Sequence, residues 1–264
     1  MKRLAVLLLC AVPLSAQPAA ELPVPVEAAV PVEAAVIVQR FPHDPRAFTE
    51  GLFIDRGELF ESTGMAGRSS VRRVDLKTGK VLASVAIPPP YFGEGIAPWK
   101  GQVLSLTWQD GTGFRWDRRT LRKQGSFRYS GEGWALTSTG TELVMSDGTS
   151  QLRFIDPATF AVRRTLKVTF KGRPLNQINE LEWVRGQVLA NIWMTDSVVR
   201  IDPASGKVVG VIDLTALHRD AAAFGNDQVA NGIAWDARTG KLYFTGKEWP
   251  WLYQVRLERT GQQL

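Results

Sequence analysis

The sequence predicts an all-β protein, a five-bladed β-propeller with four-stranded antiparallel blades around a central channel. Three observations lead to this prediction. Five similar units fill most of the chain, and each contains two β-rich runs joined by a turn glycine. Further turns with Asp-Pro or Thr-Gly-Lys separate additional short runs. A helical pattern is visible only around residues 214–223. Units of roughly forty to fifty residues, built from short strands, are typical of propeller blades.

The repeats align on one glycine in each unit. The five turn glycines are Gly57, Gly101, Gly140, Gly186 and Gly240. Runs such as QVLSLTW and QVLANIW follow them, and runs such as GLFID and GIAWD precede them. Because a propeller closes its ring by pairing the two ends of the chain in one blade, we expect the strand at 35–40 to complete the blade that ends at 253–257.

The N-terminal region has a different composition. Residues 1–16 combine two basic residues, a short apolar run and small residues, which predicts a signal peptide too short to span a membrane. The only cysteine, Cys10, would leave with this peptide. Residues 17–36 contain a tandem PVEAAV copy and predict an extended spacer, followed by a catalytic propeller over residues 37–264. We therefore expect an exported protein, either periplasmic or secreted.

Charge and histidine content exclude several classes of function. The net charge is +6, but the basic residues are scattered, which predicts a solvated surface and no nucleic-acid groove. There are only two histidines, His43 and His218, and no zinc-ligand spacing. We expect His43, in Pro-His-Asp-Pro, to belong to a structural turn. We also expect a monomer without a membrane span.

Counting from the turn glycines gives two sets of equivalent positions. Seven residues before the glycine, or slightly more in the last unit, lie Glu50, Glu94, Gly133, Asn179 and Asn231. Seven residues after it lie Gly64, Trp108, Asp147, Trp193 and Lys247. In a propeller, both sets would meet at one mouth of the channel. Trp134 adjoins Gly133, while Phe48 and Phe92 each precede one of the glutamates by two residues.

Glu94 is the strongest catalytic candidate in this group. It lies between two glycines and next to the aromatic pair Tyr91 and Phe92. Burial against aromatic walls raises the pKa of a glutamate and prepares it for proton transfer. A structural alternative is that Glu94 starts a strand and that the whole set caps strands and holds the blades together. This alternative is strongest for Asn231 and Asp147, which lie in turn-forming Asn-Gly and Asp-Gly dipeptides.

Long segments of the chain resemble a known enzyme family. Among them are FPHDPRAFTEGL, YFGEG, INELEWVRGQVLANIWMTD and TGKEWPWLYQV, and together the similar segments span about residues 40–257. They are similar to glutaminyl cyclases, or glutaminyl-peptide cyclotransferases, of the plant-and-bacterial type. The resemblance implies a five-bladed propeller and an aminoacyltransferase that converts N-terminal glutamine of peptides or proteins to pyroglutamate with release of ammonia.

The resemblance also implies roles for individual residues. The catalytic glutamate of the family corresponds to Glu94, and its polar partners to Asn179 and Lys247. The aromatic residues of the substrate pocket correspond to Phe48, Phe92, Trp108, Trp134 and Trp193. One departure concerns Glu50, where plant members have glutamine, so Glu50 and Glu94 both stay candidates for holding the substrate amine.

The chemistry of cyclisation suits these residue types. A carboxylate can take a proton from the α-amine and later protonate the departing NH2 group, which is the role expected for Glu94. Asn179 and Lys247 are candidate donors to the amide oxygen, although Lys247 could instead balance Glu50. Indoles can hold the glutamine folded and exclude water. No cofactor is required, and a structural Ca²⁺ in the channel is one option. The alternatives are a calcium-dependent lactonase-like hydrolase and a non-catalytic peptide-binding propeller.

Overall fold

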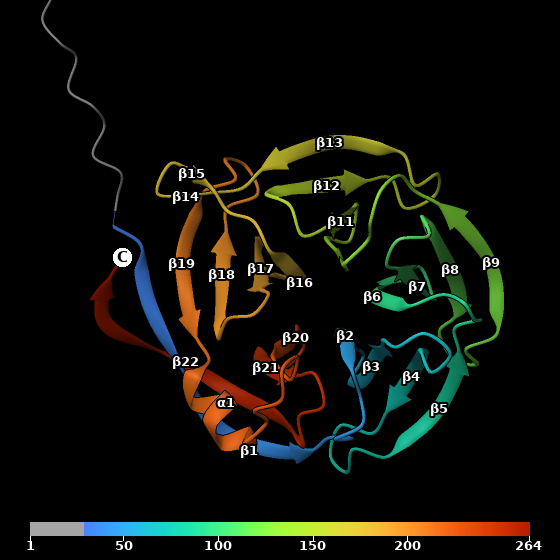
Figure 1. The fold of residues 1–264 in the computed structure, drawn as a ribbon, viewed down its shortest axis with the longest axis horizontal. Helices are drawn as coiled ribbons and strands as arrows, with labels where there is room; N and C mark the ends of the chain where they lie inside the picture. The colour runs from blue at the N-terminus through green and yellow to red at the C-terminus, as the bar shows by residue number, and fades with distance from the viewer. Residues whose placement is uncertain (1–28) are drawn as a thin grey trace, which may run out of the picture.

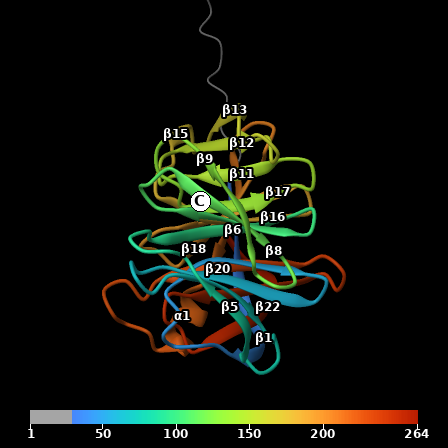
Figure 2. The same cartoon turned by 90° about the vertical axis from the view of Figure 1, so that its right-hand side faces the viewer.

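The computed structural model describes residues 29–264, which form a ring of five β-sheet blades (Figure 1). The predicted signal peptide and residues 17–28 of the predicted spacer lie outside the described residues. Figure 2 shows the same ring from the side. The predicted architecture is confirmed, and none of the helices within residues 29–264 is long and apolar enough to cross a membrane.

Each blade is an antiparallel sheet whose first strand lies nearest the channel. The first blade consists of β2 (Thr49–Asp55), β3 (Glu58–Thr63), β4 (Ser70–Val74) and β5 (Val81–Ala86). The second consists of β6 (Gly93–Trp99), β7 (Gln102–Thr107), β8 (Thr112–Asp117) and β9 (Lys123–Arg128). The third consists of β10 (Ala135–Ser138), β11 (Leu143–Ser146), β12 (Gln151–Ile155) and β13 (Val162–Lys167). The last two are β16 (Ile178–Val184), β17 (Gln187–Ile192), β18 (Ser197–Ile201) and β19 (Val208–Asp213); and β20 (Ala230–Asp236), β21 (Lys241–Gly246), β22 (Trp251–Gln263) and β1 (Pro31–Pro42).

Two smaller elements lie between the blades. The hairpin β14 (Thr169–Phe170) and β15 (Arg173–Pro174) precedes the fourth blade, and helix α1 (Thr215–Ala221) connects β19 to β20. The inner strands contact one another in the closed order β2, β6, β10, β16 and β20. Apolar side chains from adjacent blades pack in the wedges between them. Phe53 and Phe60 of the first blade, for example, share one cluster with Phe114 and Trp116 of the second.

The two ends of the chain close the ring as predicted. Strand β1 pairs with β22 in antiparallel register, with Ala35 opposite Leu257 and Arg40 opposite Tyr253. However, β1 begins at Pro31, so the second PVEAAV copy belongs to the propeller and not to the spacer. Proline is tolerated at the first residue of a strand, and β1 is held on both sides because it also pairs in parallel with β19.

The turn glycines used for the alignment share one backbone property. All five have a positive φ, between 67° and 93°. In the first, second and fourth blades the preceding residue also has a positive φ, namely Arg56, Lys100 and Arg185. Two consecutive residues with positive φ are the requirement of the tight hairpin turn that matches strand twist. In these three blades the inner two strands are therefore joined by the same kind of two-residue turn, over residues 56–57, 100–101 and 185–186, which keeps equivalent positions at the same height in the channel. The connections in the third and fifth blades are longer and span residues 139–142 and 237–240.

Candidate active site

A pocket of about 330 Å³ opens at the end of the channel where the inner strands begin. Its lining is Phe48, Glu50, Met65, Phe92, Glu94, Trp108, Trp134, Asn179, Trp193, Asp227 and Lys247. The structure thus brings together all nine residues that the sequence predicted for the site, although they come from segments up to two hundred residues apart. Met65 and Asp227 were not predicted. The convergence depends on local irregularities in the inner strands.

Those irregularities are β-bulges at equivalent places in four blades. The strand register shifts between Thr49 and Gly51, between Gly93 and Ile96, between Ile178 and Leu181, and between Ala230 and Ile233. Glu50, Glu94, Asn179 and Asn231 lie within these shifts. A bulge changes the direction of a side chain relative to the regular strand. In these four inner strands it therefore allows a polar side chain to depart from the alternation of its sheet.

Close contacts between blades fix the backbone around these bulges. A Cβ atom on Gly51 would lie 2.6 Å from the backbone nitrogen of Ile96, and one on Gly95 would lie 2.4 Å from Cα of Ala135. Only glycine fits such approaches. The Ser62 hydroxyl donates to the carbonyl oxygen of Glu94 at 2.6 Å. These contacts explain why a glycine directly follows each of the two glutamates.

Glu94 lies in an unusual electrostatic environment. Its side chain is buried, and within residues 29–264 no hydrogen bond or ion pair reaches its carboxylate. Burial raises the pKa of Glu94 well above its usual value, and the nearby negative charge of Glu50 raises it further, against the opposing effect of Lys247. A carboxyl group with this setting binds a proton at neutral pH far better than an exposed glutamate does.

Glu50 differs from Glu94 because it has two partners. Lys247 Nζ lies 3.0 Å from Glu50 Oε1, and the Asn231 amide donates to Glu50 Oε2 at 3.3 Å. Burial raises the pKa of Glu50 to about 7, although Lys247 favours the ionised form. Burial alone would lower the pKa of Lys247, but Glu50, Asp227 and Glu94 outweigh it and raise that pKa. Lys247 also lies over the Phe48 ring, 4.4 Å from its centroid.

Aromatic rings surround the carboxylates on the other sides. Phe92 makes edge contacts with Phe48 and Trp108, at centroid distances of 6.2 and 5.9 Å. Trp134 and Trp193 pack edge to face at 5.8 Å. The buried Oδ1 of Asn179 has no hydrogen-bond partner in the described part of the chain. The pocket therefore offers one unengaged amide group and one unengaged carboxyl group between aromatic walls.

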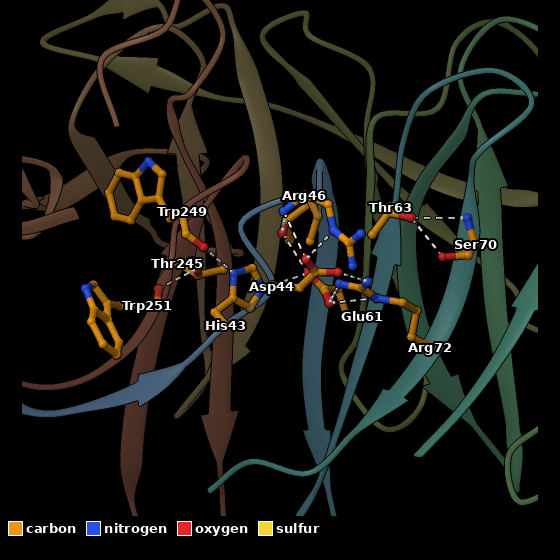
Figure 3. Close-up of polar contacts among 12 residues, drawn as sticks. His43, Asp44, Arg46, Glu61, Thr63, Ser70, Arg72, Thr245, Trp249 and Trp251 are labelled. Atoms are coloured by element: carbon orange, nitrogen blue, oxygen red, sulfur yellow. Dashed lines mark hydrogen bonds and ion pairs between the residues drawn. The ribbon is translucent and has the colours of Figure 1, made fainter. Parts of the chain in front are cut away.

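A buried ionic network lies close to the segment that carries Lys247. Figure 3 shows His43 between Glu61 and the Trp249 carbonyl, with Arg72 on the far side of Glu61. His43 Nδ1 lies 2.7 Å from that carbonyl oxygen and Nε2 lies 2.9 Å from Glu61 Oε1. Burial alone would lower the pKa of His43, but Glu61 and the Trp249 carbonyl, which are both acceptors, favour the doubly protonated imidazole and raise that pKa. His43, expected in a structural turn, thus joins the beginning of the propeller to the loop of 247–250.

The remaining members of the two sequence sets do not line the pocket. Asp147 accepts from the backbone nitrogen of Thr149 at 3.1 Å and pairs with Arg153 at 3.3 Å, which agrees with its Asp-Gly turn. Asn231 donates to the carbonyl oxygen of Thr49 at 2.9 Å and thereby holds the backbone next to Glu50. These two residues follow the structural alternative that the sequence left open.

Three residues near the pocket were missed by the sequence analysis. Asp227 lies in the loop after α1, outside every repeat, and its carboxylate lies 3.4 Å from Trp193 Nε1 and 4.0 Å from Lys247 Nζ. Met65 follows the glycine at the end of β3. Glu132 accepts hydrogen bonds from two pocket indoles. Its position two residues before Trp134 was the only signal available for it. Among residues 29–264, no group of three or more His, Cys, Asp or Glu side chains is arranged to hold a metal ion.

Comparisons with known proteins agree with this site. The profile of the glutamine cyclotransferase family matches residues 5–257. A glutaminyl-peptide cyclotransferase of Arabidopsis thaliana is 43% identical over 229 residues, which cover 85% of this chain and 72% of the relative. The crystal structure of Myxococcus xanthus glutaminyl cyclase superposes with a TM-score of 0.83 at 38% identity, covering 88% of this chain and 99% of that chain. The chain therefore belongs to the glutamine cyclotransferase family and is an enzyme of the glutaminyl-peptide cyclotransferase type.

Proposed function

We propose that this chain converts the N-terminal glutamine of peptides or proteins to pyroglutamate, with Glu94 as the group that moves the protons. The observation that carries the proposal is the setting of Glu94, a buried carboxyl group that has no hydrogen-bond or ion-pair partner among residues 29–264 and lies in a pocket walled by three indoles. Family membership supports the reaction type. The geometry of the pocket and the chemistry that cyclisation requires support the residue roles proposed below.

The first step is removal of a proton from the substrate amine. The α-ammonium group is attracted to a pocket that contains Glu94, Glu50 and Asp227. A general base works best when its pKa is close to that of the group it deprotonates, and an α-amine has a pKa of about 7.7 to 8.0. Because burial raises the pKa of Glu94, this carboxylate is a much better match for the amine than an exposed glutamate would be.

The second step closes the ring. The free amine forms a bond to the side-chain amide carbon, and negative charge develops on the amide oxygen. Asn179 is the candidate donor to that oxygen, and Lys247 adds positive charge to the same pocket while it holds Glu50. Glu94 gives its proton to the departing nitrogen and takes up the second proton that the ring nitrogen loses. The carbon–nitrogen bond of the amide breaks, and ammonia leaves.

The aromatic walls supply the third requirement, which is a folded substrate. A glutamine side chain has several rotatable bonds, and cyclisation needs the one arrangement in which the amine meets the amide carbon. Trp108, Trp134 and Trp193 can enclose that arrangement and raise the effective concentration of the two groups. They also limit access of water, so that cyclisation is favoured over hydrolysis of the amide.

The direct test is incubation of the purified chain with a short peptide that begins with glutamine. We expect loss of ammonia by mass spectrometry and a product blocked to N-terminal sequencing. A peptide of the same sequence with an acetylated glutamine is the control, because its amine cannot attack. Chelator should leave the rate unchanged, since the proposed steps use side chains only. Inactivation by chelator would instead favour the calcium-dependent hydrolase, and binding without ammonia release would favour a non-catalytic propeller.

A further inference from the structure

Glu132 does not line the pocket, but its carboxylate accepts hydrogen bonds from two tryptophans that do. Its Oε2 atom accepts a hydrogen bond from Trp108 Nε1 at 2.8 Å and another from Trp134 Nε1 at 2.8 Å. Its Oε1 atom accepts from the Gln109 side chain at 3.2 Å. Trp108 follows strand β7 of the second blade, whereas Trp134 precedes β10 of the third. One carboxylate oxygen therefore connects indoles from two different blades.

Trp108 needs such a restraint more than a core residue does. Its side chain is 39% exposed, so packing alone fixes it less well than the fully buried Trp116 or Trp249. Hydrogen bonds to a charged acceptor are stronger than bonds between neutral groups. The hydrogen bond from Trp134, followed by those from Trp108 and Gln109, holds the pKa of Glu132 below its usual range against the effect of partial burial. Glu132 therefore stays ionised at neutral pH.

The backbone of Glu132 is itself anchored. Arg153 Nη2 donates to the Glu132 carbonyl oxygen at 2.6 Å, and the same guanidinium pairs with Asp147 at 3.3 Å. The next residue, Gly133, donates its backbone N–H to the Trp108 carbonyl oxygen at 2.9 Å. The carboxylate thus projects from a segment that is tied to both blades, which is the condition for a side chain that positions others.

We propose that Glu132 is a positioning residue that sets the orientation of Trp108 and Trp134 and thereby holds the substrate glutamine in its cyclising arrangement. The proposal rests on the proposed function of the pocket. It assigns the effect to the shared acceptor atom and not to the charge of Glu132. Small misplacements of groups that orient a substrate can lower rates by about a hundredfold, so loss of the shared acceptor is expected to be visible in turnover.

Two substitutions separate the acceptor from the charge. Glu132→Gln keeps one carbonyl oxygen for both indoles, and Glu132→Leu removes it at similar size. We expect Glu132→Leu to lower kcat/KM by about ten- to a hundredfold, and Glu132→Gln to stay within about threefold of the wild type. Glu142→Leu is the matched control, because it removes a carboxylate that pairs with Arg163 on the surface.

A second readout does not depend on activity. In ¹H–¹⁵N spectra of the free protein, the indole signals of Trp108 and Trp134, assigned with Trp→Phe variants, should shift in Glu132→Leu. The signals of Trp116 and Trp249 are internal controls, since their indoles donate to Ser105 and to the Gln228 carbonyl. Unchanged Trp108 and Trp134 signals, wild-type turnover of Glu132→Leu, or equal impairment of both variants would overturn the proposal. A wild-type chain that releases no ammonia would refute the proposed function instead. The indole signals would still show whether Glu132 holds Trp108 and Trp134.

Discussion

Glu61 and Glu94 lie in neighbouring blades and are both buried, yet their surroundings shift their pKa values in opposite directions. Glu61 is contacted by His43 and Arg72 and accepts a hydrogen bond from Thr49 at 2.7 Å. Burial alone would raise the pKa of Glu61, but His43 and Arg72 outweigh it and lower that pKa to about 2. Glu94 has no such partner, and its pKa is raised. Burial is therefore common to both, and the partners decide which glutamate can exchange protons near neutral pH.

Two further buried glutamates have other combinations of partners. Glu50 has one cation, Lys247, and burial brings its pKa to about 7. Glu182, on the inner strand of the fourth blade, accepts hydrogen bonds from neutral donors that include the Trp235 backbone and the Thr137 hydroxyl. Burial raises the pKa of Glu182 to about 8, although these hydrogen bonds oppose the shift. Glu61, Glu50 and Glu182 thus contact cations or hydrogen-bond donors. Among residues 29–264, neither kind of partner contacts the Glu94 carboxylate.

The largest effect is expected from Glu94→Gln. Removal of the proton acceptor should lower kcat/KM by about 10²- to 10⁴-fold, because general acid–base catalysis contributes on that scale. Folding should be unaffected, since the amide has nearly the same shape and no described partner is lost. Ammonia release and thermal unfolding of the same preparation check both statements. A variant that keeps near-wild-type turnover would remove Glu94 from the proposed role.

Glu61→Gln should have the opposite profile. It leaves the cations of His43 and Arg72 buried without their carboxylate, and breaking a buried pair typically costs about 3–5 kcal/mol. Denaturant unfolding at pH 7 measures this loss. The depressed pKa also means that Glu61 stabilises the fold above pH 4.5, and that this contribution disappears as the pH falls toward about 2. An unfolding free energy equal to the wild type would contradict the comparison.

Glu50→Gln tests the coupling between the two glutamates of the pocket. The negative charge of Glu50 raises the pKa of Glu94, so its removal should lower that pKa. The limb of the kcat/KM profile that belongs to Glu94 should then move to lower pH, while the limb set by the substrate amine stays in place. Profiles measured from about pH 4 to pH 9 decide the matter, since the usual pKa values of a glutamate and of an α-amine lie in that range. A shift toward higher pH would rule out this coupling.

The smallest effect is expected from Glu182→Gln, and it concerns stability alone. The raised pKa means that the folded state binds this proton more tightly than the unfolded chain does. Its contribution to stability is therefore full below pH 4.5 and is lost as the pH rises toward about 8. The amide oxygen can still accept from the Trp235 N–H, and the amide NH2 group can donate to the Thr137 hydroxyl oxygen, so the variant should lose less stability than the wild type between pH 5 and pH 8. If the unfolding free energies of the variant and the wild type changed equally with pH, Glu182 would not titrate between pH 5 and pH 8.

The sequence could predict the fold and the gathering of the pocket because both depend on repetition. The turn glycines, with their positive φ, place equivalent strand positions at one height, so counting from them locates Glu50, Glu94 and Asn179. The bulges that orient these side chains can hardly be recognised in the sequence, where the only sign of them is the glycine after each of the two glutamates. The assignment of Glu94 over Glu50 could not be made by counting, because it depends on Lys247, which pairs with Glu50.

Counting along the repeat was not sufficient for every part of the molecule. Asp227 comes from an irregular loop after α1, where no counting rule applies. Asp147 occupies the same topological position as Trp108 and Trp193, but its carboxylate caps its own turn and pairs with Arg153. The beginning of β1 was placed too late, because the pattern of prolines and alanines resembles a linker and its pairing partners lie at the other end of the chain. The deciding contacts of Asp227 and of β1 are distant in sequence, whereas those of Asp147 are local.

The most direct test of the account is a titration of the two contrasting carboxyl groups. Carbon NMR of protein labelled at glutamate Cδ, with the Glu94 signal assigned by its loss in Glu94→Gln, follows each group separately. We predict that Glu94 in the free enzyme titrates well above 4.5, whereas Glu61 stays ionised until the pH approaches about 2 or the protein unfolds. A Glu94 signal that titrates at or below 4.5 would contradict the claim that an unpartnered carboxyl group is the proton acceptor of this site.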